Sequence, residues 1–163
     1  MSMAVYPGSF DPISYGHMNL ARRGLKIFDR LIVAVARNVA KETLFTPDER
    51  VEMVREVLRD EPNVTVDSFE GMTVDYVRGC GANVMLRGIR TVSDFEYEFQ
   101  MALINRHFTT DIETMFMMTS NEYSFLSSRF IKEAVALGAD VSAFVPPLVE
   151  TRLREKLQET APE

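Results

Sequence analysis

Apolar residues recur along this chain with two spacings, one typical of buried strands and one typical of helix faces. Short apolar runs and alternations predict five strands, at residues 3–6, 31–36, 64–69, 82–86 and 112–118. A first helix is indicated by the 3.6-residue spacing of Met18, Ala21, Leu25 and Phe28. The same spacing and capping residues predict the other helices, at residues 46–60, 72–78, 92–108, 128–137 and 147–157.

The order of these elements predicts the fold. Strands that alternate with helices form a parallel sheet, because parallel neighbours need crossover helices between them. We therefore expect the α/β class, with a doubly wound, five-stranded parallel sheet and a C-terminal helix. The pattern contains no repeat or linker, so residues 1–158 are expected to form one domain, followed by a frayed tail at 159–163.

The long helix predicted at 92–108 has two apolar stripes rather than one. The first stripe contains Val92, Phe95, Phe99 and Leu103, and the second contains Tyr97, Met101, Ile104 and Phe108. Packing on a sheet uses a single apolar face of a helix. The second stripe therefore favours a subunit interface, and the alternative is that both stripes are internal.

Composition narrows the class of protein. The chain has 163 residues, of which 46% are hydrophobic, enough for one core. Its longest apolar run, Leu31–Ala36, is far below the roughly 20 residues of a membrane span, and no export signal is apparent. A single cysteine, Cys80, cannot form an internal disulfide, so we expect a cytoplasmic protein. The net charge of −6 argues against nucleic-acid binding.

Candidate chemistry begins in the loop after the first strand. In doubly wound sheets, ligands bind beyond the carboxyl ends of strands where the strand order reverses. Prolines and glycines at 7–12 fix a tight path there, and Ser14-Tyr15-Gly16-His17 opens the next helix. Unpaired N–H groups at a helix start bind anions. His17 and the Ser14 hydroxyl either face such an anion together, or His17 only caps or packs; the loop alone does not decide between them.

Three other strand ends carry basic or hydroxyl groups. Arg37 and Lys41 follow the second strand, Arg87-Gly88-Ile89-Arg90 the fourth, and residues 120–129 with Lys132 the fifth. If the first and fourth strands are neighbours, His17 and Arg87 flank one crevice suited to a polyanion. Neither a P-loop ending nor a complete dinucleotide fingerprint occurs, which disfavours a P-loop kinase and a dehydrogenase.

These motifs resemble a known superfamily. Ser14-Tyr15-Gly16-His17, together with Leu126-Ser127-Ser128 and Lys132, resembles the motifs of nucleotidyltransferases. A narrower resemblance, to the phosphopantetheine adenylyltransferases of bacterial coenzyme A synthesis, covers about residues 5–157. It rests on Tyr6–Pro12, Phe45-Thr46 with Glu49-Arg50, Arg87–Arg90, and Asp94–Glu98 followed by Asn105-Arg106. The resemblance implies a Rossmann-like fold and transfer of the adenylyl group of ATP to 4′-phosphopantetheine, which yields dephospho-coenzyme A and pyrophosphate.

The resemblance also implies residue roles. His17 would be the catalytic residue, as a stabiliser of the transition state, and the acceptor would be bound by Ser9, Lys41, Thr73 and Arg87. The nucleotide would be bound by Ser9, Phe10, His17, Gly88, Ile89, Arg90, Glu98, Tyr123, Ser124, Phe125, Leu126, Ser127, Ser128 and Arg129. Mg²⁺ would be held mainly by the phosphates of ATP. Family members are hexamers, and coenzyme A would act as a feedback inhibitor.

No general base is required for this reaction. The acceptor is a phosphate monoester with a second pKa near ~6, so it is largely dianionic at neutral pH. Cationic and hydroxyl groups then suffice to align two anions and to neutralise developing charge.

Some points stay open in the sequence. Lys132 stands where the superfamily has an arginine, and Arg129 is the alternative phosphate ligand. Asp94 either belongs to the nucleotide site or caps the long helix. Two rival functions also remain: a superfamily transferase that uses nicotinamide mononucleotide or a cytidylyl donor, and a non-catalytic nucleotide sensor on the same fold.

Overall fold

Five parallel strands form one sheet in the computed structural model, which describes residues 1–160. The strands are β1 (Met3–Gly8), β2 (Arg30–Ala36), β3 (Val64–Phe69), β4 (Val84–Ile89) and β5 (Glu113–Met118). Their spatial order is β3-β2-β1-β4-β5, and every neighbouring pair is parallel. The doubly wound prediction is confirmed, and β1 and β4 are neighbours at the point where the strand order reverses.

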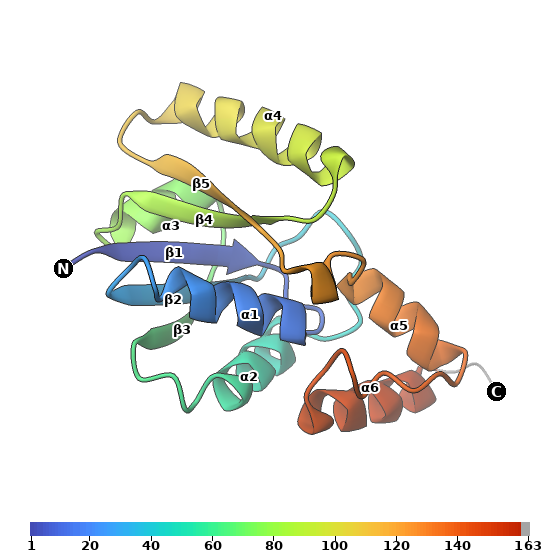
Figure 1. Ribbon diagram of the computed structural model, residues 1–163. Coiled ribbons are helices and arrows are strands. Elements are labelled where there is room, and N and C mark those ends of the chain that lie inside the picture. The colour runs from blue at the N-terminus through green and yellow to red at the C-terminus, as the bar shows by residue number, and fades with distance from the viewer. Residues whose placement is uncertain (161–163) are drawn as a thin grey trace.

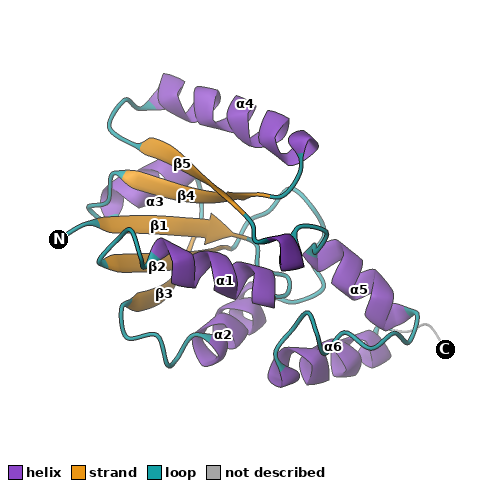
Figure 2. Ribbon diagram, in the orientation of Figure 1, coloured by secondary structure: helices purple, strands orange, loops and turns teal. Residues whose placement is uncertain are grey.

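Helices cover both faces of this sheet (Figure 1). They are α1 (Tyr15–Gly24), α2 (Pro47–Val57), α3 (Thr73–Gly79), α4 (Val92–Phe108), a short 3₁₀ turn η1 (Asn121–Tyr123), α5 (Ser128–Ala136) and α6 (Pro147–Glu159). One core packs α1, α2, α5 and α6 against the sheet, and a smaller core packs α3 against its other face. The loops at the carboxyl ends of the strands gather near η1 and the start of α5 (Figure 2).

Two strands extend beyond their predicted ends. β1 runs to Gly8, because Pro7 and Gly8 still pair with β2. β4 runs to Ile89, because its ladder with β5 continues to the pair Ile89–Met118. Arg87 and Gly88 therefore lie within β4, and only Arg90 of the predicted basic segment follows it. Strand pairing, which the apolar run 82–86 does not report, causes this difference.

Helix ends follow local capping chemistry. Thr46 and Glu49 form the predicted reciprocal cap of α2, with Glu49 N–H donating to Thr46 Oγ1 and Thr46 N–H to Glu49 Oε2. Helix α1 ends at Gly24, so Leu25 and Phe28 of its predicted face lie beyond it. A Cβ at Gly24 would lie 3.0 Å from Leu86 Cδ2, which explains the glycine at this close approach.

The final helix is longer than predicted. Helix α6 ends at Glu159, with Thr160 as its C-cap, so the start of the expected frayed tail is helical. The rest of that tail, residues 161–163, lies outside the described residues. Within residues 1–160, no helix is long and apolar enough to cross a membrane.

Helix α4 contributes no buried residue; Phe99 and Leu103 of its first stripe line a cavity with β5, yet most residues of both stripes are exposed. The ring of Phe95 packs edge-on to that of Phe116 at 5.9 Å, yet Phe95 is still 44% exposed. The alternative in which both stripes are internal is wrong for this chain. The first stripe lies toward β5 without being buried by it, because α4 joins neither core.

Candidate active site

The loop between β1 and α1 lies at the junction of β1 and β4, and its path depends on Phe10. Phe10 has a φ of +47°, in the left-handed region that non-glycine residues rarely occupy. Its ring is buried, 5.4 Å from that of Tyr6 and 5.0 Å from that of His17. The buried ring of Phe10 thus packs against the imidazole of His17, and only the main chain of Phe10 is available to a ligand.

Ser14 and His17 form a reciprocal cap at the start of α1. The N–H of Ser14 donates to Nδ1 of His17 at 3.1 Å, and the N–H of His17 donates to Oγ of Ser14 at 3.4 Å. Because Nδ1 accepts a hydrogen bond from a main-chain N–H, the neutral imidazole carries its proton on Nε2. The Ser14 hydroxyl is buried against His17 rather than directed at an anion, so the alternative in which both side chains face the anion does not hold for Ser14. Capping uses one nitrogen of His17 and leaves the other as a donor.

The electrostatic environment keeps His17 neutral. Burial, and after it the positive charges of Arg90, Lys41 and Arg87, together lower the pKa of His17 to about 4. These same charges make the surroundings of Nε2 favourable for a bound anion. At neutral pH the site therefore offers a neutral N–H donor surrounded by cations.

Arg87 is held in a fixed orientation beside β1. Its Nε and Nη2 donate to the two carboxylate oxygens of Glu98 on α4, and Nη1 donates to the carbonyl of Pro7 at 2.8 Å. Burial acts to lower the pKa of Arg87, but its hydrogen bonds to the negatively charged Glu98 raise the pKa overall. Arg87, Glu98 and Thr73 line one cavity of about 120 Å³, to which α4 also contributes Asn105.

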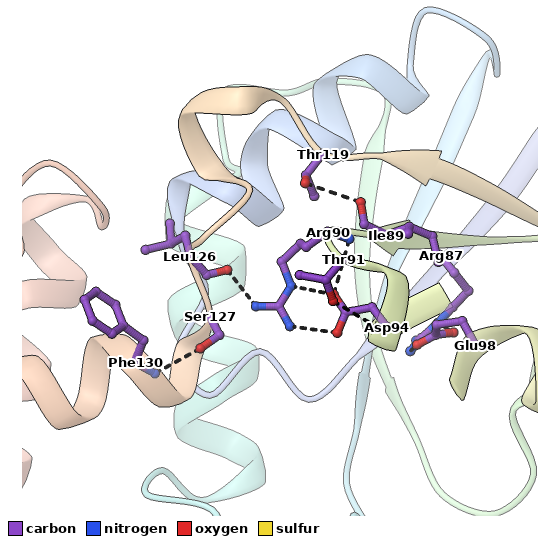
Figure 3. A network of polar contacts seen from close by, with 10 residues as sticks. All are labelled: Arg87, Ile89, Arg90, Thr91, Asp94, Glu98, Thr119, Leu126, Ser127 and Phe130. Carbon is purple, nitrogen blue, oxygen red and sulfur yellow. Dashed lines mark hydrogen bonds and ion pairs between the residues drawn. The ribbon is translucent and has the colours of Figure 1, made fainter. Parts of the chain in front are cut away.

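Arg90 joins α4 to the loop after β5 (Figure 3). Its Nε and Nη2 donate to the carboxylate of Asp94 at 3.0 and 3.4 Å, and Nη1 donates to the carbonyl of Leu126 at 2.8 Å. Thr91 caps α4 by accepting from the N–H of Asp94. The interpretation of Asp94 as the helix cap is therefore wrong; Asp94 lies in the first turn and pairs with Arg90.

Hydroxyl groups at the start of α5 already have partners. Ser127 is the N-cap of α5 and accepts from the N–H of Phe130 at 3.0 Å (Figure 3). Ser128 donates from Oγ to the carbonyl of Pro12 at 2.8 Å. The first N–H groups of a helix have no acceptor within it, so main-chain donors remain for an anion here. Arg129 is 87% exposed and pairs with Glu133.

The rest of the segment predicted to bind nucleotide lies against α1. Gly16 packs beside Tyr123, since a Cβ at Gly16 would lie 3.5 Å from Cβ of Tyr123, in ordinary van der Waals contact. Ser124 donates to the carbonyl of Asn121, Leu126 is buried, and Phe125 is 59% exposed. Gly88 and Ile89 at the end of β4 lie beside the same loop, because Thr119 donates to the carbonyl of Ile89.

Lys132 forms an ion pair with a buried carboxylate. Its Nζ lies 2.7 Å from Oδ2 of Asp11, whose side chain is 1% exposed. Asp11 also accepts from the N–H groups of Leu44 and Phe45. The side chain of Lys132 thus binds protein rather than standing free for a phosphate.

Arg50 is a residue that sequence reasoning missed. It is 1% exposed, and Nη1 donates to the carbonyls of Ser9 and Ala36, both at 2.8 Å. Burial lowers the pKa of Arg50, and its Nε has no hydrogen-bond partner among the described residues. The sequence signal that could have indicated a buried role for Arg50 is its position next to the core residue Val51 on an amphipathic helix. Arg50 ties the end of β2 to the loop after β1.

Lys41 and Ser9 complete the predicted set. Lys41 is exposed in the loop after β2, and it has no ion-pair partner within residues 1–160. Its charge lowers the pKa of His17, so the two residues lie within electrostatic reach of each other. Ser9 is partly exposed at the end of β1. The described residues contain no cluster of three His, Cys, Asp or Glu side chains that could hold a metal ion.

Known proteins resemble this chain over nearly its whole length. The cytidylyltransferase-like family model matches residues 5–134. A phosphopantetheine adenylyltransferase of Geotalea daltonii is 55% identical, over 96% of this chain and 97% of that protein. One of Caldanaerobacter subterraneus subsp. tengcongensis is 49% identical, over 98% of this chain and all of that protein.

A solved structure shares the fold. It comes from Vibrio parahaemolyticus and is provisionally named a nicotinate-nucleotide adenylyltransferase. It aligns with a TM-score of 0.71 at 19% identity and covers 99% of this chain and 98% of its own. At this level of identity the likeness concerns the fold alone.

Proposed function

The chain belongs to the phosphopantetheine adenylyltransferase family of nucleotidyltransferases, and we propose that it performs the family's reaction in the crevice above β1 and β4. In that reaction a phosphate oxygen of 4′-phosphopantetheine attacks the α-phosphorus of ATP, and pyrophosphate leaves. The products are dephospho-coenzyme A and pyrophosphate. The step belongs to coenzyme A synthesis.

The observation that carries this assignment is the arrangement around His17. Its Nε2–H is the free donor of a neutral imidazole, and the charges of Arg90, Lys41 and Arg87 act on it. The attacking phosphate is already a dianion, so the reaction needs no base at this position. Donors aimed at the charge that develops on the α-phosphate lower the barrier without taking up a proton.

The substrates divide between the two sides of the crevice. We assign the acceptor phosphate to Ser9, Lys41 and Arg87, with the pantetheine arm toward Thr73; the cavity that Arg87 and Thr73 share supports this. ATP is assigned to His17, the Gly88–Arg90 segment and the loop Tyr123–Arg129, supported by the bond that joins Arg90 to Leu126. Main-chain N–H groups, rather than the bonded hydroxyls of Ser127 and Ser128, are proposed to bind its phosphates.

Mg²⁺ is proposed to enter with the triphosphate. Hard cations bind oxygen ligands, and a chain without its own cluster of three ligands among residues 1–160 leaves the phosphates as the main source. The residues therefore fit a metal that belongs to the substrate. It would supply neutralisation of phosphate charge.

Assembly, regulation and location complete the proposal. The exposed apolar stripes of α4 support a homo-oligomer, and we propose the hexamer that the family resemblance implies. Coenzyme A contains both halves of the product, so we propose that it inhibits by occupying the same crevice. A cytoplasmic location is supported by the free thiol of Cys80.

One assay tests the function against its rivals. Pyrophosphate release from ATP and Mg²⁺ is measured with 4′-phosphopantetheine, nicotinamide mononucleotide or glycerol phosphate as the acceptor. Release with 4′-phosphopantetheine alone is expected. Release with another acceptor instead would assign a different transferase, and release with none would favour a nucleotide sensor.

A further inference from the structure

Two side chains on one face of α5 hold the loop after β1. Ser128 and Lys132 are one helical turn apart; Ser128 binds the carbonyl of Pro12 at 2.8 Å, and Lys132 binds the carboxylate of Asp11 at 2.7 Å. The side chain of Lys132 is 22% exposed, and that of Asp11 is 1% exposed. Helix α5 therefore fixes the position of Asp11 through a largely buried ion pair.

Asp11 in turn restrains the loop between β2 and α2 through hydrogen bonds. Its two oxygens accept from the N–H groups of Leu44 and Phe45, at 3.0 and 2.9 Å. Phe45 is buried, and these residues end the segment that leaves β2 and carries Lys41. The opposite end of that segment is held by Arg50, which binds the carbonyl of Ala36. The loop with Lys41 is thus anchored at both ends by buried charged side chains.

The anchor at Asp11 depends on the charge of Lys132. A buried carboxylate that loses its cation becomes an uncompensated charge, and it either takes up a proton or moves toward water. Either change weakens its hydrogen bonds to Leu44 and Phe45, because charged acceptors bind N–H groups more strongly than neutral ones. Loss of Lys132 therefore loosens the end of the loop that carries Lys41.

We propose that Lys132 is a positioning residue for the acceptor: acting through Asp11, it fixes the loop that holds Lys41 over the acceptor phosphate. The inference rests on the proposed function, because it takes Lys41 as the phosphate ligand. It differs from the role that the superfamily motif implies, in which this position contacts the phosphates of ATP. The two roles therefore predict that loss of Lys132 raises KM for different substrates: KM for 4′-phosphopantetheine if it positions the loop, and KM for ATP if it binds the phosphates of ATP.

Steady-state kinetics of Lys132→Met separate the two roles. A positioning role raises KM for 4′-phosphopantetheine by about tenfold and changes kcat and KM for ATP by about threefold or less, since only the acceptor side is disturbed. Lys132→Arg keeps the positive charge and should restore most of the loss. Should Lys132→Met not fold, Lys132→Gln retains a donor of similar size and the same comparison applies.

A matched control is available in Lys156. Its Nζ lies 2.8 Å from Oε1 of Glu49, and its side chain is 20% exposed, so the lysine resembles Lys132 in ion-pair length and burial, whereas Glu49 is 33% exposed. Its ammonium joins α6 to α2 by binding the carboxylate of Glu49, and it binds neither Asp11 nor the main chain of Leu44 and Phe45. Lys156→Met should leave both KM values unchanged.

Hydrogen exchange gives a second readout that needs no substrate. The amides of Leu44 and Phe45 should exchange faster in Lys132→Met than in the wild type, and at the wild-type rate in Lys156→Met. A raised KM for ATP with an unchanged KM for 4′-phosphopantetheine would overturn the inference, and so would unchanged exchange of both amides. A wild-type protein that releases no pyrophosphate with 4′-phosphopantetheine would instead refute the proposed function, and amide exchange would then decide the link from Lys132 to the loop.

Discussion

The main-chain N–H of Ser14 donates to Nδ1 of His17 across 3.1 Å, which determines the nitrogen that carries the imidazole proton. A main-chain donor cannot become an acceptor, so protonation of Nδ1 would place two N–H groups face to face. The bond therefore acts with burial to keep His17 neutral and to direct Nε2–H outward. It also explains why a histidine can cap a helix and serve a ligand together.

The tautomer and pKa of His17 can be read by ¹⁵N NMR of the imidazole. We expect Nε2 to be protonated and Nδ1 unprotonated from pH 8 down to pH 6, with titration near the pKa of about 4 that burial produces. His107→Gln removes the only other histidine signal and serves for assignment. A titration of His17 near pH 6.5 would show that the imidazole becomes cationic in the working range.

The same shift in pKa predicts a pH-dependent stability. The pKa of His17 is lower in the folded chain than its ordinary value of 6.5, so the unfolded chain binds the proton more tightly. This contribution is fully present above pH 6.5 and is lost as the pH falls toward 4. Urea unfolding of His17→Gln should therefore show a shallower decrease in free energy across that window than the wild type.

The two-pronged hydrogen bonding, or fork, of the Arg87 guanidinium to Glu98 predicts that even the conservative substitution Arg87→Lys weakens binding of the acceptor. Arg87→Lys keeps the charge but cannot bind both carboxylate oxygens and the carbonyl of Pro7 together. We expect KM for 4′-phosphopantetheine to rise by about tenfold, equivalent to about 1.4 kcal/mol. Arg59→Lys after α2 is the control, because Arg59 pairs with Glu56 at the surface. Equal KM values for Arg87→Lys and the wild type would contradict the role of the fork.

Arg50 should make a large contribution to stability. Arg50→Met removes the donors for the partly buried carbonyls of Ser9 and Ala36, and unsatisfied buried groups cost about 1–3 kcal/mol each. We expect the free energy of unfolding in urea to fall by about 2–4 kcal/mol. Arg55→Met changes an exposed arginine on the same helix and should cost little. Similar losses for both variants would show that the bonds of Arg50 are not stabilising.

The exposed apolar stripes of α4 predict that a single charged substitution on them disrupts the oligomer. Ile104 is 49% exposed in the single chain. If this stripe is buried between subunits, a carboxylate at this position would destabilise the oligomer, because burying an unpaired charge is costly. Ile104→Glu should lower the molar mass measured by light scattering after gel filtration. Gln100→Glu adds the same charge to the same helix at an exposed polar position and should not. An unchanged mass for Ile104→Glu would remove this stripe from the interface.

Local patterns predicted most of the fold, and contacts between distant segments account for what they missed. The alternation of strands and helices predicted the parallel sheet, and α4 begins and ends at the expected residues because Thr91 caps it. The end of β4 depends on its pairing with β5, which the strand's own apolar run does not report. The helix periodicity of α4 identified its two stripes, but their exposure depends on where the helix packs.

The site shows the same division. The tight turn and helix start at His17 are local features, and they predicted an anion site before any fold was known. The ion pair of Asp11 with Lys132 joins residues 121 positions apart, so the sequence alone could not assign Lys132 to protein rather than ligand. Arg50 was missed for the same reason, since its acceptors lie in two other segments.

The rate of adenylyl transfer by His17→Ala tests the central claim most directly. Removing an oriented donor that binds charge formed in the transition state costs about 10²–10³-fold in kcat in comparable sites. We expect at least about a hundredfold fall in kcat in a variant that still folds, with little change in the Kd of ATP. A kcat within about threefold of the wild-type value would contradict the account and leave His17 as the cap of α1 alone.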